Sequence, residues 1–233
     1  MKIQSVTDIG IKRKDNQDNY WSARLDIDGV EAGVLCLCDG MGGLSKGGFA
    51  SSTVVAKVKD FFSRSLDFGE LQVELKAVNS ELSRMSKEEK SPMGTTCTIV
   101  FCMSGTYKVL HIGDSRCYKI SNGIGEVLTK DHTVIEKYKA EGRELPDRLI
   151  NKYRNMLTRC IGVIDNIYFD YSEGNYESGD MFLVCSDGFW HYLSEDCLTK
   201  DILLSKKNIQ SVIDNFKFVD RETDNITVGV LEV

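Results

Sequence analysis

Carboxylate side chains occur in four short polar segments that are scattered along the 233-residue chain, each beside an apolar run. A fold that gathered the ends of these runs would bring several carboxylates together, and each would raise the pKa of the others. Mg²⁺ and Mn²⁺ relieve such repulsion, because they favour octahedral sites of carboxylate, carbonyl and water oxygens. The pattern therefore predicts, first of all, a metal site. The segments are Arg13-Lys14-Asp15-Asn16-Gln17-Asp18, Asp39-Gly40-Met41-Gly42-Gly43, Ser186-Asp187-Gly188 and Asp224-Asn225-Ile226-Thr227.

The order and composition of these segments resemble the metal-dependent protein phosphatase family, of the protein phosphatase 2C type, in its short bacterial form. A single Asp-Gly dipeptide is usually just a turn, but here further segments match in family order, so the resemblance covers essentially the whole chain. The further segments are Gly94-Thr95-Thr96, Gly113-Asp114-Ser115-Arg116, Thr129-Lys130-Asp131-His132 and Arg154-Asn155-Met156-Leu157-Thr158-Arg159.

The resemblance implies a set of ligands for two core ions, Mn²⁺ or Mg²⁺. Asp39 ends a buried run and is the predicted bridge, and Gly40 lets the backbone approach closely enough for its carbonyl to bind the first ion. Asp187 and Asp224 are expected to join Asp39 on the second ion. Asp18 is expected to hold metal-bound water, an outer-shell role that tunes basicity.

Two more roles and two departures follow from the same resemblance. Asp114, together with Asp187, is expected to anchor a weaker third ion. Arg13 is expected to grip the substrate phosphate, since a guanidinium can donate two charge-assisted hydrogen bonds at once. Met41 stands where eukaryotic relatives often have a histidine that donates a proton, and Gln17 stands where many relatives have glutamate; both departures also occur in bacterial members.

The elements that must position these residues are apolar runs of two kinds. Residues 32–38, 93–103, 107–112 and 181–185 read as buried strands, and short polar turns at 104–106 and 121–123 favour antiparallel hairpins. Residues 48–62 and 71–85 carry apolar side chains at helical spacing. We expect an α+β fold of two packed sheets between helices, and the resemblance makes this a central antiparallel β-sandwich flanked by helical layers, in a single domain over residues 1–233.

Residues 133–160 differ from the rest of the chain, because they are polar and helical in character and carry seven cations against four anions on a chain of net charge −6. By resemblance this segment is a flap beside the active site. Its positive charge could attract phosphorylated, acidic substrate segments, or it could simply be a solvated insertion of mixed charge.

Composition sets broad limits on the function. A net charge of −6 and a pI near 5.2 argue against a general nucleic-acid binder. The sequence shows neither a signal peptide nor a run long enough to span a bilayer, so we expect a soluble cytoplasmic protein. Cys36 and Cys38 fall on one face of a strand, and buried free thiols are favoured over zinc or disulfide roles for the eight cysteines.

The predicted function is that of a metal-dependent serine/threonine protein phosphatase, which hydrolyses phosphoserine and phosphothreonine by attack of a metal-bridging hydroxide. Its substrates would be phosphorylated targets of a partner kinase, and we expect a monomer that binds neither nucleic acid nor membrane. No Cys-x5-Arg signature supports a covalent thiol mechanism. The alternatives are a catalytically silent module that binds a phosphoprotein, and a metal-dependent phosphodiesterase or nuclease.

Overall fold

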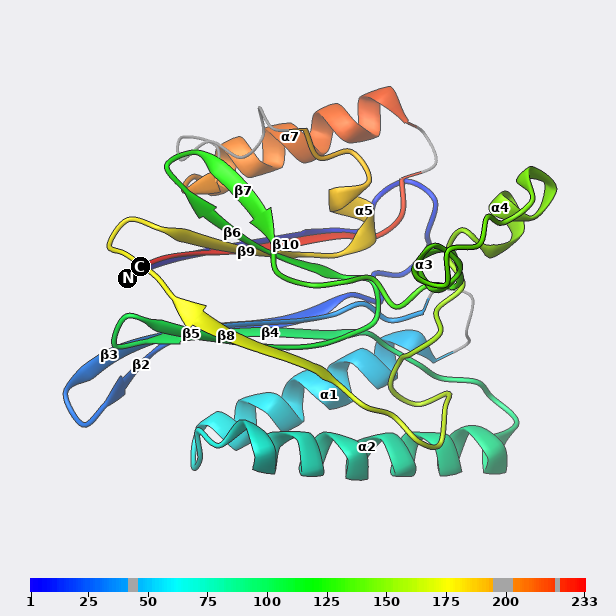
Figure 1. Ribbon diagram of the computed structural model, residues 1–233, viewed down its shortest axis with the longest axis horizontal. Helices are drawn as coiled ribbons and strands as arrows, with labels where there is room; N and C mark the ends of the chain where they lie inside the picture. Colours follow the sequence, from blue (N-terminus) through cyan, green and yellow to red (C-terminus); the bar gives the residue numbers. More distant parts are fainter. Residues whose placement is uncertain (42–45, 195–202, 221–222) are drawn as a thin grey trace.

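The computed structural model describes residues 1–41, 46–194, 203–220 and 223–233, and it consists of two five-stranded sheets packed face to face (Figure 1). Every strand pair in both sheets is antiparallel. Sheet A has the order β1-β10-β9-β6-β7, with β1 (Lys2–Asp8), β10 (Ile226–Glu232), β9 (Met181–Cys185), β6 (Arg116–Ser121) and β7 (Ile124–Val127). Sheet B has the order β2-β3-β4-β5-β8, with β2 (Asn19–Ile27), β3 (Val30–Cys38), β4 (Cys97–Met103), β5 (Thr106–Ile112) and β8 (Asp170–Asn175).

Helices cover the outer face of each sheet, so the molecule has four layers (Figure 1). The long helices α1 (Gly47–Phe62) and α2 (Phe68–Glu89) lie on sheet B, and α5 (Asp187–Trp190) and α7 (Lys206–Val219) lie on sheet A. Asp67 caps α2 by accepting hydrogen bonds from the backbone N–H groups of Gly69 and Glu70. The predicted α+β sandwich with flanking helices is confirmed.

Three apolar clusters fill the spaces between the layers. The inner cluster joins Leu35 and Val100 of sheet B to Phe182 and Val184 of sheet A. The second lies between sheet B and helices α1 and α2, and the third lies between sheet A and helices α5 and α7. The sheets are therefore buried on both faces, which explains why their strands read as continuous apolar runs rather than as alternating ones.

The two ends of the sandwich are built differently. At one end, which we call the distal end, three hairpins close through two-residue turns in which both residues have positive φ, as type I′ turns require. These turns are Asp28-Gly29, Ser104-Gly105 and Asn122-Gly123. At the other end, β3 stops just before Asp39 and β10 starts just after Asp224. This second end carries the polar segments singled out in the sequence.

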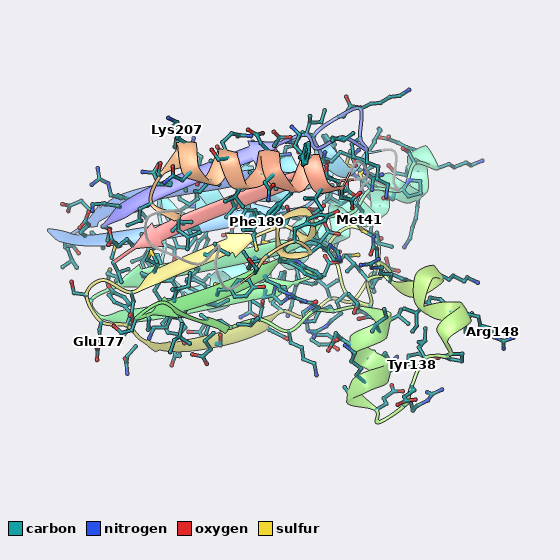
Figure 2. All side chains as sticks on the ribbon, turned by 90° about the horizontal axis from the view of Figure 1, so that it is seen from above. Met41, Tyr138, Arg148, Glu177, Phe189 and Lys207 are labelled. Atoms are coloured by element: carbon teal, nitrogen blue, oxygen red, sulfur yellow. The ribbon has the colours of Figure 1, made fainter. Side chains whose placement is uncertain are left out.

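The predicted flap extends from the body at that second end. It contains two short helices, α3 (Val134–Ala140) and α4 (Asp147–Tyr153), and Figure 2 shows Tyr138 and Arg148 projecting away from the sandwich. The predicted strand at 93–103 is shorter than expected, since β4 begins only at Cys97. Residues 94–96 instead hydrogen-bond to Met41, Ile161 and Asp39, which joins this end of sheet B to the base of the flap.

Among the described residues, no helix combines the length and the apolar character that crossing a membrane requires.

Candidate active site

A cavity of about 300 Å³ opens between the ends of the two sheets and the base of the flap. It gathers six of the seven predicted site residues, although they come from five separate segments of the chain. Thr96, Met41, Asn155 and Leu157 complete its wall. The six are Arg13, Asp39, Gly40, Asp114, Asp187 and Asp224.

Asp18, the seventh predicted residue, is buried behind this cavity rather than in its wall. Both of its carboxylate oxygens are buried without a hydrogen bond of good geometry among the described residues, and the nearby Thr227 and Ser186 side chains offset the effect of burial on its pKa only in part. The side-chain oxygen of the neighbouring Gln17 is likewise buried and without a hydrogen-bond partner in the described residues. Burial, together with the negative charges of Asp187 and Asp224, raises the pKa of Asp18 to about 7. Unpartnered buried acceptors of this kind fit a role in holding water on an ion.

The carboxylates in the cavity repel one another. Burial and the charges of Asp18, Asp187 and Asp114 raise the pKa of Asp39 well above its usual range. Burial and the charge of Asp187 do the same for Asp114. Divalent cations would remove this repulsion, so the oxygen-rich donor set fits Mg²⁺ or Mn²⁺. In the described part of the chain, no histidine or cysteine lines the cavity that would favour a softer ion.

Asp39 is held in place by hydrogen bonds between its backbone and the two threonines that precede β4. Its N–H donates to Thr96 Oγ1 at 2.8 Å, and its carbonyl accepts from the Thr96 N–H at 2.9 Å and from Thr95 Oγ1 at 2.8 Å. A Cβ on Gly40 would lie 2.5 Å from the Gln17 carbonyl oxygen and 2.6 Å from the Gly47 backbone. Only glycine fits at that position, and the tight packing fixes the backbone that follows the Asp39 carboxylate.

Asn225 ties the N-terminal segment to the start of β10. Its side chain donates to the carbonyls of Ile9 and Asp15 at 2.8 and 3.1 Å, and it accepts from the Gln17 N–H at 2.9 Å. Asn225 is buried and follows Asp224 directly. This one amide therefore places the Arg13–Asp18 segment against the Asp224 carboxylate.

Arg13 and Asp224 form a bidentate ion pair that the sequence did not indicate. Nε and Nη2 of Arg13 donate to the two oxygens of Asp224 at 2.6 and 2.7 Å. Although burial opposes it, this contact lowers the pKa of Asp224 and keeps that carboxylate ionised. Because Asp224 takes up two donors of the guanidinium, a phosphate that used the same edge of Arg13 would have to displace it.

The flap is anchored to the Asp114 loop through a buried histidine. The Gly113 N–H donates to His132 Nδ1 at 3.0 Å, so Nε2 carries the ring proton and donates to Asp170 at 2.9 Å. Arg159, at the end of the flap, donates to the same Asp170 carboxylate at 2.7 Å. Burial opposes the shift, but these contacts lower the pKa of Asp170 to about 2. His132 thus holds the turn at Gly113 against the base of the flap.

The structure thus brings the predicted residues together and adds several that the sequence did not single out. Thr96, Asn155 and Leu157 belong to segments that match the family, but nothing in their residue types marked them as cavity walls. Asn225 was visible only as the neighbour of Asp224. Gly42 and Gly43, which complete the Asp39 segment, lie outside the described residues.

Comparison with known proteins identifies the relatives of this fold. The protein phosphatase 2C family matches residues 12–223. Protein phosphatase PhpP of Streptococcus pneumoniae is 28% identical over 258 residues, covering 100% of this chain and 98% of that protein. The solved serine/threonine phosphatase of S. agalactiae has a TM-score of 0.84 and 26% identity, and the match covers 100% of this chain and 99% of that one.

One solved relative bears on the ions. The catalytic domain of the serine/threonine protein phosphatase PstP, solved in complex with two manganese ions, has a TM-score of 0.78 at 25% identity, and the match covers 99% of this chain and 97% of that one. The predicted family and enzyme class are confirmed: the chain belongs to the protein phosphatase 2C family of protein phosphatases.

Proposed function

We propose that this protein is a metal-dependent phosphatase that removes phosphate from phosphoserine and phosphothreonine in proteins. One observation carries the proposal: four carboxylates and an arginine, from five separate segments, meet in one open cavity at the end of the sandwich. A cluster of like charges destabilises a fold unless it is compensated. Bound cations and an anionic substrate supply that compensation.

In this proposal the ions are Mn²⁺ or Mg²⁺, with Asp39 shared between two of them. Gly40 completes the first site through its carbonyl, and Asp187 and Asp224 complete the second. When bound, such ions would supply Lewis-acid chemistry: they would make a water molecule acidic enough to attack as the predicted hydroxide, and they would offset the charge that develops on the phosphoryl oxygens. A third ion would use Asp114 together with Asp187.

The protein's own groups would hold and orient the reactants. Asp18 would accept hydrogen bonds from water at the back of the cavity, because its two buried oxygens make no hydrogen bond of good geometry within the described residues. Arg13 would bind the phosphate, and Asp224 would first have to release the guanidinium edge that it now occupies, as it would if it served as a metal ligand. Met41 lines the cavity and has no proton to donate, so the leaving oxygen would either take its proton from water or depart unassisted.

The substrate would be a phosphorylated protein, and a partner serine/threonine kinase would supply it. A second cavity of about 270 Å³ shares Asn155, Asp187 and Asp224 with the first and adds Lys12 and Arg154 to its wall. Because Asp187, Asp220 and Asp224 line the same cavity, it would hold the residues next to the phosphorylated one without favouring acidic side chains. Action as a monomer in the cytoplasm stays a prediction.

The direct test is hydrolysis of a phosphothreonine peptide with Mn²⁺, compared with the same assay in EDTA. We expect turnover only with the metal, and little turnover of a phosphotyrosine peptide. Single-stranded DNA, incubated in parallel, should remain intact. A chain that binds the phosphopeptide in Mn²⁺ but never releases phosphate would be the silent module, and cleavage of the DNA would make it a nuclease.

A further inference from the structure

Three buried thiols lie close together next to the proposed active site, and one of them belongs to Cys38, the residue before Asp39. The register that pairs Cys36 with Ile99 and Leu37 with Thr98 places Cys38 beside Cys97 on the neighbouring strand. Cys36 lies two residues from Cys38, so it projects from the same face of β3. The three Sγ atoms lie within 4.8 Å of one another. In the described part of the chain, no other three Cys, His, Asp or Glu side chains bring ligand atoms this close together.

The surroundings of this thiol cluster are apolar. Cys36, Cys38 and Cys97 belong to the core between sheet B and helices α1 and α2, and at most 1% of each side chain is exposed. Hard ions such as Mg²⁺ and Mn²⁺ need oxygen ligands, and the thiol cluster contains none. Sulfur ligands select soft ions.

The spacing of the sulfur atoms fits one ion between them. With a metal–sulfur distance of about 2.3 Å, a planar three-sulfur site needs sulfur–sulfur separations of about 4 Å. The observed upper limit of 4.8 Å means that side-chain adjustments of less than about an ångström close the site. Zn²⁺ prefers four ligands, whereas Cu⁺ accepts three.

We propose that Cys36, Cys38 and Cys97 form a three-sulfur binding site for a soft monovalent metal ion, with Cu⁺ as the biological candidate. The site is distinct from the oxygen-lined cavity, from which it differs in ligand type and in access to solvent. Two of its cysteines are nevertheless next to residues that line that cavity: Cys38 precedes Asp39, and Cys97 follows Thr96. The Thr96 side chain accepts a hydrogen bond from the Asp39 backbone N–H.

The test is an anaerobic titration of the full chain with Cu⁺ against the competing chelator bathocuproine disulfonate. Long equilibration is needed, because the thiols are reached only when the core opens locally. The parent protein and every variant in this test carry Cys197→Ser, because Cys197 lies outside the described residues and its thiol could also bind Cu⁺. We expect one tightly held Cu⁺ per chain, X-ray absorption that shows three sulfur neighbours, and a raised unfolding temperature.

Two variants decide whether the sulfur atoms of the thiol cluster are responsible. Cys97→Ser should weaken Cu⁺ binding by at least about 10- to 100-fold, because the loss of even an outer-shell partner of a metal ligand has an effect of that size. Cys102→Ser is the matched control, since Cys102 is equally buried on the same strand but faces the space between the sheets. Cys36→Ala provides a second loss of ligand if Cys97→Ser does not fold. Equal affinity in Cys97→Ser (or Cys36→Ala) and Cys102→Ser, or failure of the parent protein to retain Cu⁺ against the chelator, would overturn the proposal.

Discussion

The distal end of the sandwich and the opposite end, which carries the candidate active site and which we call the catalytic end, connect their strands by different means. At the distal end, each of the three hairpins turns within two residues, and the turn is specified by those two residues alone. At the catalytic end, the connections depend on contacts between residues far apart in sequence, such as Asn225 with Ile9 and Asp15. A substitution at the distal end should therefore disturb only its own turn. A substitution at the catalytic end should also disturb segments that are distant in the sequence.

The two ends also differ in what their side chains contribute to stability. An added Cβ at Gly105 would meet nothing within 4 Å, so the distal turn is open to solvent. At the catalytic end, buried carboxylates face one another and raise the pKa of Asp39. The catalytic end is thus destabilised by the groups that we expect to bind metal, whereas the distal end carries no such cost.

The largest expected effect is that of Asp39→Asn. Without the shared ligand, Mn²⁺-dependent hydrolysis should fall by at least about 10³-fold, in line with the loss of a group that stabilises the transition state. The metal-free protein should become more stable, because one of the repelling charges is gone. Activity assays and thermal unfolding in EDTA measure the two effects. An active Asp39→Asn protein would show that Asp39 is not the bridge.

Asn225→Ala tests whether the catalytic end depends on distant contacts. The change leaves two carbonyls and one N–H without their partner, and we expect it to lower the free energy of unfolding by about 2–3 kcal/mol. It should also weaken Mn²⁺ binding about tenfold, because the segment that carries Asp18 loses its anchor. Denaturant titration and metal titration would show this. A variant of normal stability would mean that these contacts add little.

The pH dependence of stability tests whether the buried carboxylates destabilise the catalytic end. The folded-state pKa of Asp18 is about 7, above its ordinary value of 3.8. A raised pKa means that protonation favours the folded state, so this contribution is fully present below about pH 4 and is lost as the pH rises through 7. In EDTA, the unfolding temperature should fall between pH 5 and pH 8 by on the order of 5 °C relative to Asp18→Asn.

Added Mn²⁺ provides the complementary measurement, because it binds the ionised carboxylates. The rise in unfolding temperature that Mn²⁺ causes should be larger at pH 8 than at pH 6. An equal rise at both pH values would show that protons and metal do not compete for this cluster.

The smallest expected effect lies at the distal end. Gly105→Ala forces a side chain into a left-handed conformation, φ +77°, but meets no neighbour. It should cost about 1 kcal/mol of stability and leave hydrolysis unchanged. Gly113→Ala is its counterpart at the catalytic end, where φ is +115° and the new Cβ would lie 2.5 Å from the Thr96 side chain. Gly113→Ala should lose both stability and activity. If the two variants had the same stability and the same rate of hydrolysis, the proposed difference between the two ends would be wrong.

The sequence predicted best what depends on neighbouring residues. The helix expected at 48–62 is α1 (Gly47–Phe62), and the helix expected at 71–85 is the core of α2 (Phe68–Glu89). The hairpin turns at 104–106 and 121–123 were also marked by their own residues. By contrast, the expected strand at 93–103 starts late, because residues 94–96 form hydrogen bonds with residues 53 or more positions away in the sequence.

The site was predicted as a set of residues but not as a geometry. The acidic segments were visible in the sequence, and their convergence followed from the resemblance. Neither showed that Arg13 pairs with Asp224 or that Asp18 lies behind the cavity wall. The thiol cluster shows the same limit, since the sequence placed Cys36 and Cys38 on one face, but only the strand register adds Cys97.

The pairing of β1 with β10 sets Lys2 opposite Glu232, so both ends of the chain leave the molecule side by side, and they do so away from the flap (Figure 1). A fluorescent protein, an affinity tag or a surface attached at either end would sit behind the molecule and leave the entrance to the phosphate cavity unobstructed. Immobilised protein should therefore process bulky phosphoproteins as readily as free protein does.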